Sequence, residues 1–303
     1  MIVRLVGSEM CIRDSKRDFD VSHVIAMEPM NWNGKKILEN LDIELVRNNQ
    51  FLCHYEDFAE WTTTKTKFKM EDFYRWQRKR LDILMDGSTP CEGKWNFDHD
   101  NRERPPRDGR EWPPITLFEH DDIDNDILQN LDGFWGAYPK GVWPVTREQA
   151  LIRLDEFVNG ALKPFGPYED AMLGKEWKLA HSVLSSSLNI GLLHPMEVVR
   201  AVEQAYIDGE APINSVEGFI RQVIGWREYV WGLYWLWMPE YKSENFLEAN
   251  RDIPPAFCEQ GSTEMSCIRG AMDHLHEYAY THHIERLMPV SYTHLRAHET
   301  YDH

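Results

Sequence analysis

The 303-residue sequence contains no apolar run of membrane-spanning length, and no secretory signal opens it. It has only five cysteines, and none of them stand in Cys-x-x-Cys spacing. They are Cys11, Cys53, Cys91, Cys258 and Cys267. Scattered thiols argue against a disulfide framework and suit a reducing compartment. No internal repeat is evident. We therefore expect a cytoplasmic protein that does not enter membranes. A monomer is also expected.

Positive charge is also scarce, because the formal net charge is −17. This balance argues against a protein that coats nucleic acid indiscriminately. Residues 61–110 are the exception, since they hold twelve Lys or Arg against nine Asp or Glu, a local charge of +3. Any DNA contact should involve this segment, in which Lys65, Lys67 and Lys69 precede a basic helix predicted over 71–84. The alternative for that helix is a solvated face.

The two ends of the sequence are related to each other. The stretch 6–15 can be encoded by DNA whose reverse complement, read onward, encodes 290–300. The pair resembles translations of opposite strands of a transposon-end adapter used in sequencing libraries. We therefore expect residues 1–15 and 290–303 to be adapter-derived artefacts. The insert 16–289 is then expected to be cut at both ends.

The remaining segments predict an α/β portion followed by an all-α portion. Residues 21–26 and 43–46 read as strands around a short helix over 33–40, which fits the end of an α/β domain. Helical patterns dominate later, beginning with a helix over 148–162 that Thr146 should cap. The expected domains are 16–70, the α/β end; 71–145, the basic helix and interdomain linker; and 146–289, the helical domain.

The chain is organised around an aromatic stretch from Asn214 to Trp237. One long buried helix is predicted there, because five apolar residues recur near helical spacing. They are Phe219, Val223, Trp226, Val230 and Trp237. Glu217 and Arg221 stand one turn apart and can pair. The polar groups of this helix are either satisfied within the core or face a large polar, aromatic ligand.

Four motifs together resemble the signatures of one family. Residues 217–229 read Glu-Gly-Phe-Ile-Arg-Gln-Val-Ile-Gly-Trp-Arg-Glu-Tyr, and residues 93–102 read Gly-Lys-Trp-Asn-Phe-Asp-His-Asp-Asn-Arg. Residues 181–193 form a serine-rich loop, and residues 280–288 carry two adjacent histidines. These motifs resemble the photolyase/cryptochrome family. The resemblance is to the bacterial branch with an iron–sulfur cluster, which includes prokaryotic (6-4) photolyases.

The resemblance covers residues 19–288 with gaps and implies a partial amino-terminal α/β antenna domain, a linker and a truncated helical FAD-binding domain. It implies a DNA photolyase, a lyase that repairs pyrimidine photoproducts in damaged DNA by electron transfer from reduced FAD. The (6-4) photoproduct is the expected substrate, although this truncated chain is itself expected to be inactive. Two alternatives stay open, a cryptochrome-like blue-light sensor without repair, and an inactive fragment or helical interaction module without cofactor.

The same resemblance implies roles for single residues. His282 and His283 are the expected catalytic pair at the lesion, where an imidazole suits proton transfer near neutral pH. A zinc site with His274 and His276 is the alternative for these histidines. The expected flavin contacts are His181, Ser182, Leu184, Ser185, Asn189, Gln222, Trp226 and Arg227.

Further cofactors are implied beside FAD. Cys267 matches the first of four cysteines that hold a 4Fe-4S cluster, and the other three would lie after Met288. An antenna chromophore in the full-length protein is a further expectation. Glu259 stands where the family often has a Trp implicated in electron supply to flavin. The resemblance therefore does not identify the path by which electrons reach the flavin in this protein.

Overall fold

The structure is a computed structural model that describes residues 23–41, 43–246, 248, 250, 252–257 and 259–287. Both adapter-like ends, the first two residues of the predicted strand over 21–26, Cys258 and Met288 lie outside the described residues. By its contacts the chain divides into two compact units. Unit 1 comprises residues 1–77 and 224–244, and unit 2 comprises residues 78–223 and 245–303. This grouping does not test the domain bounds expected from the sequence, which stay a prediction.

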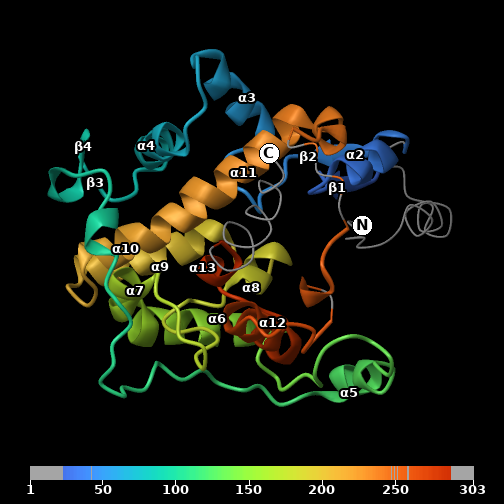
Figure 1. Ribbon diagram of the computed structural model, residues 1–303. Helices are drawn as coiled ribbons and strands as arrows, with labels where there is room; N and C mark the ends of the chain where they lie inside the picture. Colours follow the sequence, from blue (N-terminus) through green and yellow to red (C-terminus); the bar gives the residue numbers. More distant parts are fainter. Residues whose placement is uncertain are drawn as a thin grey trace. The chain divides into compact units, whose positions relative to one another are not determined.

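Unit 1 contains a small parallel βαβ arrangement (Figure 1). Strands β1 (Ile25–Met27) and β2 (Glu44–Val46) pair in parallel, and helix α2 (Trp32–Glu39) connects them. Asn31 caps α2, because its side chain accepts a hydrogen bond from the Gly34 amide. The predicted strand–helix–strand order is confirmed, although the first strand begins later than expected.

Three further helices of unit 1 enclose an aromatic core. They are α3 (Tyr55–Thr63), the first part of α4 (Met70–Leu81) and α11 (Glu228–Trp237), which is followed by the 3₁₀ turn Glu240–Ser243. The core includes Cys53, Phe58, Trp61, Phe73 and Tyr229. Gly232 allows α11 to approach α3 closely, since a Cβ there would lie 2.3 Å from the Phe58 ring.

The predicted basic helix is α4, but it ends at Leu81. Asp82 and Leu84 have positive φ angles of 52° and 50°, which a continuing right-handed helix does not allow. Arg78 is fully buried, and its guanidinium donates hydrogen bonds to the carbonyls of residues 83, 84 and 95. The expectation of a uniformly solvated basic face is therefore wrong at Arg78, because this side chain satisfies carbonyls beyond the helix end.

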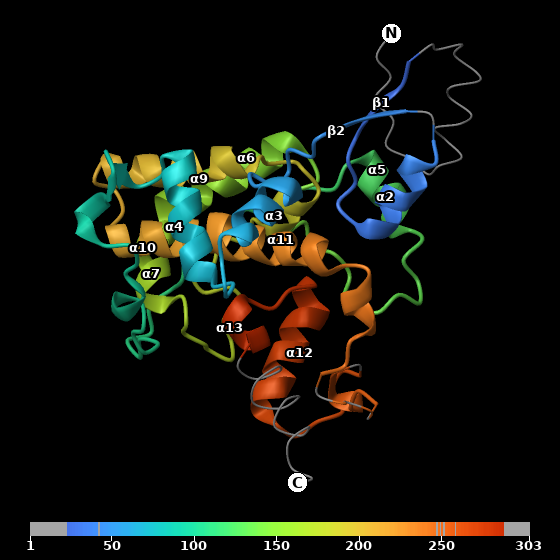
Figure 2. The same cartoon turned by 90° about the horizontal axis from the view of Figure 1, so that it is seen from above.

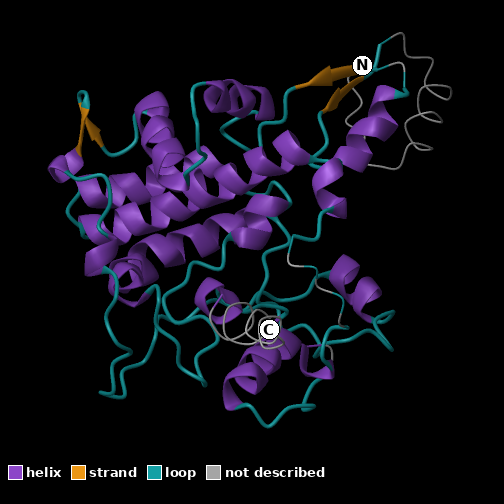
Figure 3. Ribbon diagram, turned by 45° about the horizontal axis from the view of Figure 1, so that its top comes forward, coloured by secondary structure: helices purple, strands orange, loops and turns teal. Residues whose placement is uncertain are grey.

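Unit 2 is mostly helical, and strands occur in the described part of the chain only as two small pairs (Figure 3). Its helices are α5 (Asp122–Leu128), α6 (Arg147–Glu156), α7 (Leu162–Tyr168), α8 (Ser185–Asn189), α9 (Pro195–Ile207), α10 (Ile213–Ile220), α12 (Ser266–Tyr278) and α13 (His283–Glu285). Its strands are β3 (Met85–Asp86) and β4 (Thr89–Pro90), and its 3₁₀ turns are Cys91–Gly93, Asp98–Asp100 and Pro255–Phe257. Within the described residues, no helix is both long and apolar enough to cross a membrane.

The helix predicted over 148–162 is present in two parts. Thr146 caps α6 as predicted, because its hydroxyl accepts a hydrogen bond from the Gln149 amide. The chain then passes through the π-helical segment Phe157–Ala161 into α7. Helix α7 packs tightly on α10, because a Cβ added at Gly166 would lie 2.7 Å from the Ser215 Cα.

The central helical stretch combines α10, the π-helical segment Arg221–Arg227 and α11. The prediction of a continuous helical stretch is confirmed, but the prediction that its spaced apolar residues are all buried is wrong. Trp226, Val230 and Trp237 are 46%, 58% and 38% exposed. A π-helical turn holds more residues than an α-helical turn, so it rotates the following side chains away from the face that regular spacing predicts.

Candidate functional site

A stacked pair of histidines brings the serine-rich loop and the carboxy-terminal motif together in unit 2. The rings of His181 and His282 have centroids 4.6 Å apart and planes inclined by 14°. His282 is completely buried, and Phe165 meets the His181 ring edge-on at 5.7 Å. Residues expected at the flavin and at the lesion are therefore in direct contact. We call His181 and His282 the histidine pair.

The histidine pair has unused hydrogen-bonding capacity. His181 Nε2 and both ring nitrogens of His282 are buried and have no hydrogen-bond partner among the described residues. Glu285 Oε1 lies 3.5 Å from His282 Nε2, which is too far for a good hydrogen bond. A buried polar group without a partner costs roughly 1–3 kcal/mol. A ligand with polar atoms at this place would remove that cost.

Burial lowers the pKa of both rings to about 3. At His282, the neighbouring His181 lowers the pKa further, while Glu285 acts in the opposite direction. Both rings are therefore neutral at pH 7, and each has one N–H donor and one acceptor nitrogen. The arrangement favours hydrogen bonding to a ligand over uptake of a proton from it.

Glu285 connects His282 to His274. His274 Nδ1 lies 3.1 Å from Glu285 Oε1, and both side chains are buried where α12 and α13 lie side by side (Figure 2). His276 instead packs its ring edge-on against Trp135 at 5.2 Å. His274 and His276 thus have different neighbours. The described residues contain no group of three His, Cys, Asp or Glu side chains that could hold a metal ion.

His283 is in a different environment from its neighbour. Helix α12 ends at Tyr278, and Ala279 follows in the left-handed region with a φ of 53°. His283 then begins α13 with an exposed side chain. The chain therefore presents one buried and one exposed imidazole at adjacent positions.

The other expected flavin contacts in unit 2 differ in exposure. Ser182 Oγ accepts a weak hydrogen bond from the Leu184 amide at 3.4 Å, and Leu184 is buried. Ser185 and Asn189, on the short helix α8, are exposed. Gln222 is half-buried, with its side-chain amide donating to a backbone carbonyl one turn earlier.

Two serines that the sequence analysis passed over share the character of the histidine pair. The hydroxyls of Ser186 and Ser187 are buried, and the described part of the chain offers them no hydrogen-bond partner. A hydroxyl can donate one hydrogen bond and accept two, so these groups suit a ligand rich in oxygen. The run of serines from 185 to 187 is the signal that could have identified them.

Arg227 belongs to unit 1, where its guanidinium lies 3.9 Å from the centroid of the Phe51 ring. Its Nη1 contacts Glu228 Oε1 at 3.2 Å. The Nε and Nη2 groups are buried and unpaired within the described residues. Burial lowers the pKa of Arg227, but a guanidinium stays charged at neutral pH. Unpaired N–H groups on a cation fit an anionic ligand. Trp226, also in unit 1, is exposed.

Arg221 is the centre of a buried charge cluster. Its guanidinium nitrogens lie 3.1 Å from Asp98, 3.4 Å from Glu217 and 3.7 Å from Glu169. The predicted pairing of Glu217 with Arg221 is therefore confirmed. Burial raises the pKa of Glu169 to about 8 although Arg221 opposes the shift, so this carboxyl group keeps its proton at neutral pH.

Cys267, the expected cluster ligand, is exposed near the start of α12. The other cysteines described are Cys53, which lies in unit 1, and Cys91, whose pKa is raised by burial. An iron–sulfur cluster of this kind needs four thiolates. The cysteines in the described part of the chain therefore do not make up a cluster site.

Comparison with known proteins gives related matches along the chain. Residues 10–134 match the family model described as deoxyribodipyrimidine photo-lyase-related protein. The chain is 36% identical over 281 residues to a (6-4) photolyase of Agrobacterium fabrum, which covers 89% of this chain and 55% of that protein. An uncharacterized protein of Acanthamoeba polyphaga mimivirus is 43% identical over 68 residues, or 22% of this chain and 52% of that protein.

Among solved structures, a bacterial class III photolyase from Agrobacterium tumefaciens has a similar fold. The TM-score is 0.50 at 17% sequence identity, and the match covers 93% of this chain and 56% of that chain. The chain thus spans about half the length of both photolyases. The mostly helical fold with small sheets agrees with this likeness. The family-model match and the 36% identity to the (6-4) photolyase show that the chain belongs to the photolyase family.

Proposed function

We propose that the chain is part of a light-driven flavoprotein that repairs pyrimidine photoproducts in DNA, with the (6-4) photoproduct as its substrate. The observation that carries the proposal is the histidine pair, whose three buried ring nitrogens would gain hydrogen bonds from a polar ligand. The (6-4) photolyase of Agrobacterium fabrum is the relative that motivates this choice of substrate. A sensor without repair would share the cofactor but not the need for His282.

The unpaired polar atoms fit FAD. In unit 2 these atoms are His181 Nε2 and the hydroxyls of Ser186 and Ser187. In unit 1, Arg227 Nε and Nη2 have the same character, and the flavin contact expected at Arg227 rests on the family resemblance. The diphosphate, ribityl and ring carbonyl oxygens of FAD can accept hydrogen bonds from such donors. Bound in its reduced form, FAD would supply the electron that light transfers to the lesion. The remaining expected contacts, at Ser182, Leu184, Ser185, Asn189, Gln222 and Trp226, are part of this proposal.

His282 and His283 would act on the lesion. In a neutral ring, one nitrogen of His282 donates a hydrogen bond and stabilises negative charge on the substrate. Because the ring is completely buried, this interaction is stronger than in water. The exposed His283 can reach a ligand that enters from solvent. Glu285, which contacts His274, lies 3.5 Å from His282 Nε2 and places a carboxylate beside this ring.

DNA would contact exposed lysines of unit 1. Lys65, Lys67 and Lys69 are exposed in the connection between α3 and α4 and can meet phosphates. A damaged base is the cheapest to flip out of the duplex, so the lesion can leave the stack toward a pocket. Arg78 takes no part in this contact, because its donors are engaged by carbonyls.

The iron–sulfur cluster, the antenna chromophore and the cellular location of the protein are also proposals. In the full-length protein, Cys267 would be one of four ligands of a 4Fe-4S cluster, and an antenna chromophore would occupy the amino-terminal domain. No part of the repair step proposed for His282 depends on either group. A monomeric, cytoplasmic state stays a prediction from the sequence.

The test is light-driven repair of a (6-4) oligonucleotide by the full-length protein and its His282→Ala variant. We expect His282→Ala to keep the flavin absorbance and to lose roughly 10²–10³ in repair rate, because one hydrogen-bond donor to developing negative charge is removed. His276→Ala is the matched control, because that ring packs on Trp135 and should leave repair unchanged. Wild-type repair by His282→Ala would contradict its role. A wild-type protein with bound flavin that repairs nothing in light would favour the sensor function.

A further inference from the structure

We propose that an acidic, apolar surface on α5 and the loop after it binds a basic amphipathic helix of a partner protein. This surface lies within unit 2 and contains none of the residues assigned to flavin, lesion or cluster. We call it the α5 surface. Its apolar members are Leu117, Ile123, Ile127, Phe134, Trp135 and Tyr138, and its exposed carboxylates are Glu119, Asp121, Asp122, Asp126 and Asp132.

The apolar side chains of the α5 surface are unusually exposed. Ile123 and Ile127 lie one turn apart on α5, and 72% and 56% of their surface is accessible. Phe134 and Tyr138 follow with 73% and 63%. Single exposed apolar residues are ordinary, but a contiguous group rimmed by polar residues marks an interaction site.

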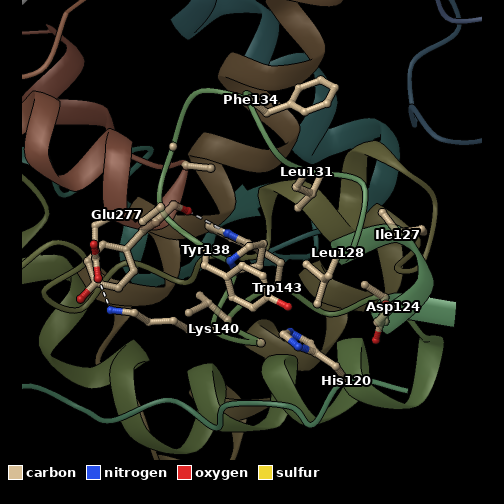
Figure 4. Close-up of a pocket in the computed structure, with 18 of the residues that line it drawn as sticks. His120, Asp124, Ile127, Leu128, Leu131, Phe134, Tyr138, Lys140, Trp143 and Glu277 are labelled. Atoms are coloured by element: carbon tan, nitrogen blue, oxygen red, sulfur yellow. Dashed lines mark hydrogen bonds and ion pairs between the residues drawn. The ribbon is translucent and has the colours of Figure 1, made fainter. Parts of the chain in front are cut away.

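Ile127, Phe134, Trp135 and Tyr138 of the α5 surface line a cavity of about 580 Å³ (Figure 4). Leu128, Leu131, Tyr138 and Trp143 lie near one another in this view, and Phe134 lies apart from them near the top. Indole Nε1 of Trp143 is already engaged by the Tyr278 carbonyl, so the interior offers mainly apolar contact. Large apolar side chains of a partner can anchor in such a hollow, as interface anchors generally do.

The charge around the cavity decides the kind of partner. Residues 111–139 contain seven Asp or Glu and no Lys or Arg. The next cation along the chain, Lys140, is already paired with Glu277. The side chains of Asp122 and Asp126 make no ion pair within the described part of the chain. A nucleic acid would be repelled here, whereas a basic partner gains from opposite charge.

An amphipathic helix with basic flanks matches both the apolar cavity and the acidic residues around it. Its apolar side chains, spaced three and four apart, would enter the cavity between α5 and the loop after it. Its Lys or Arg side chains would meet the carboxylates of the rim and the faces of Trp135 and Tyr138. Rim charges contribute mainly to the association rate and are screened by salt, so binding should weaken as ionic strength rises.

The probe is a fluorescein-labelled helix of Leu and Lys, about 18 residues or five turns long, followed by fluorescence anisotropy with the chain as printed. We expect micromolar binding that weakens about tenfold in Phe134→Ser, and several-fold in the double variant Asp122→Asn/Asp126→Asn at low salt. Phe246→Ser and Glu210→Gln/Glu264→Gln are the matched controls, since these exposed residues lie outside the α5 surface and should leave affinity unchanged.

Three outcomes would overturn the proposal. One is the absence of binding by the wild-type chain at about 100 µM, and another is equal affinity in the α5-surface variants and the controls. The third is equal binding of a helix in which Glu replaces every Lys, because this would show adhesion without charge recognition. Sedimentation distinguishes a further occupant, since a wild-type dimer that Phe134→Ser dissociates would assign the surface to a second copy of the chain. Neither assay depends on flavin or repair.

Discussion

His282 is enclosed next to His181, while its neighbour His283 is exposed, so two identical side chains differ in their access to solvent. Removal from water lowers the pKa of His282 to about 3. In a buried site a neutral ring is cheaper than a charged one, and its hydrogen bonds are stronger. For single residues such as these histidines, burial and neighbouring groups decide the chemical role more than the residue type does.

We expect acid to destabilise the fold through His282. Its pKa is about 3 in the folded chain and roughly 6.5 when unfolded, so the unfolded chain binds more protons between these values. The contribution to stability is therefore complete above pH 6.5. As pH falls below 6.5, the free energy of unfolding should decrease by up to about 1.4 kcal/mol per pH unit. Urea unfolding of wild type and His282→Gln at pH 7 and pH 5 measures the difference.

Comparing the pH dependence of unfolding in wild type and His282→Gln separates the contribution of His282 from that of its neighbours. His181, His274, His283 and Glu285 surround it and are present in both proteins. Glu169 acts in the opposite sense, because its raised pKa of about 8 means stability is lost as pH rises from 4.5 toward 8. That effect is common to both proteins and cancels. Identical pH dependence in the two would show that His282 does not titrate as described.

Arg227 should contribute to flavin affinity. Arg227→Ala removes two unpaired, buried N–H donors, so FAD should bind more weakly by roughly 1.5–3 kcal/mol, or about tenfold or more. Flavin fluorescence titration measures the dissociation constant. Lys242→Gln is the control, since this exposed cation is well separated in sequence from every proposed flavin contact. Unchanged affinity in Arg227→Ala, with an unchanged unfolding midpoint, would remove Arg227 from the site.

At the scale of elements, the π-helical segment Arg221–Arg227 is the feature that distinguishes the central stretch. It contains Gln222, Trp226 and Arg227, the three residues of this stretch expected at the flavin. Such segments are rare and are frequently found at functional sites. Here the segment also explains why Trp226 faces outward, so the irregularity and the expected site coincide.

The packing of α7 on α10 should not tolerate one added methyl group. Gly166→Ala places Cβ within 2.8 Å of three atoms of Ser215, two of them backbone, so the helices must separate. We expect a loss of about 1–3 kcal/mol in the free energy of unfolding. Gly270→Ala in α12 is the control, because no atom lies within 4 Å of its added Cβ. That change should stabilise by about 0.5–1 kcal/mol.

Thermal or urea unfolding of both glycine variants tests this geometry. The two substitutions are chemically identical and both lie within helices of unit 2. Opposite signs are therefore expected from packing alone. If Gly166→Ala is as stable as Gly270→Ala, the close approach of α7 to α10 is wrong.

At the scale of the whole molecule, charge is distributed unevenly. The net charge is −17, while residues 61–110 carry +3 and residues 111–139 contain no Lys or Arg. Such separation allows one segment to approach phosphates and another to attract basic proteins. The two proposed surfaces therefore have opposite electrostatic preferences.

DNA affinity should depend on salt through the exposed lysines. Each phosphate contact adds about 0.9 to the slope of log K against log salt for duplex DNA. Replacing Lys65, Lys67 and Lys69 with Gln should reduce that slope by roughly 2–3. Fluorescence anisotropy with a labelled duplex over a salt series provides the measurement. The control is Lys175→Gln/Lys242→Gln, two exposed cations outside the basic segment. An unchanged slope in the triple variant would exclude these lysines from the DNA contact.

The sequence by itself determined the family and the features that depend on near neighbours. The cap at Thr146 and the pairing of Glu217 with Arg221 follow from spacing within one or two helical turns. The strand–helix–strand order follows from local patterns of apolar residues. The family motifs could be recognised in the sequence because each is a short contiguous stretch.

Only the tertiary structure decided which distant residues meet. The stacking of His181 on His282, the burial of Arg78 and the cavity beside α5 each depend on segments far apart in the sequence. The pKa values follow these contacts, because desolvation comes from atoms that no local pattern specifies. The π-helical segment likewise altered which aromatic side chains are exposed, and regular helical spacing does not encode that shift.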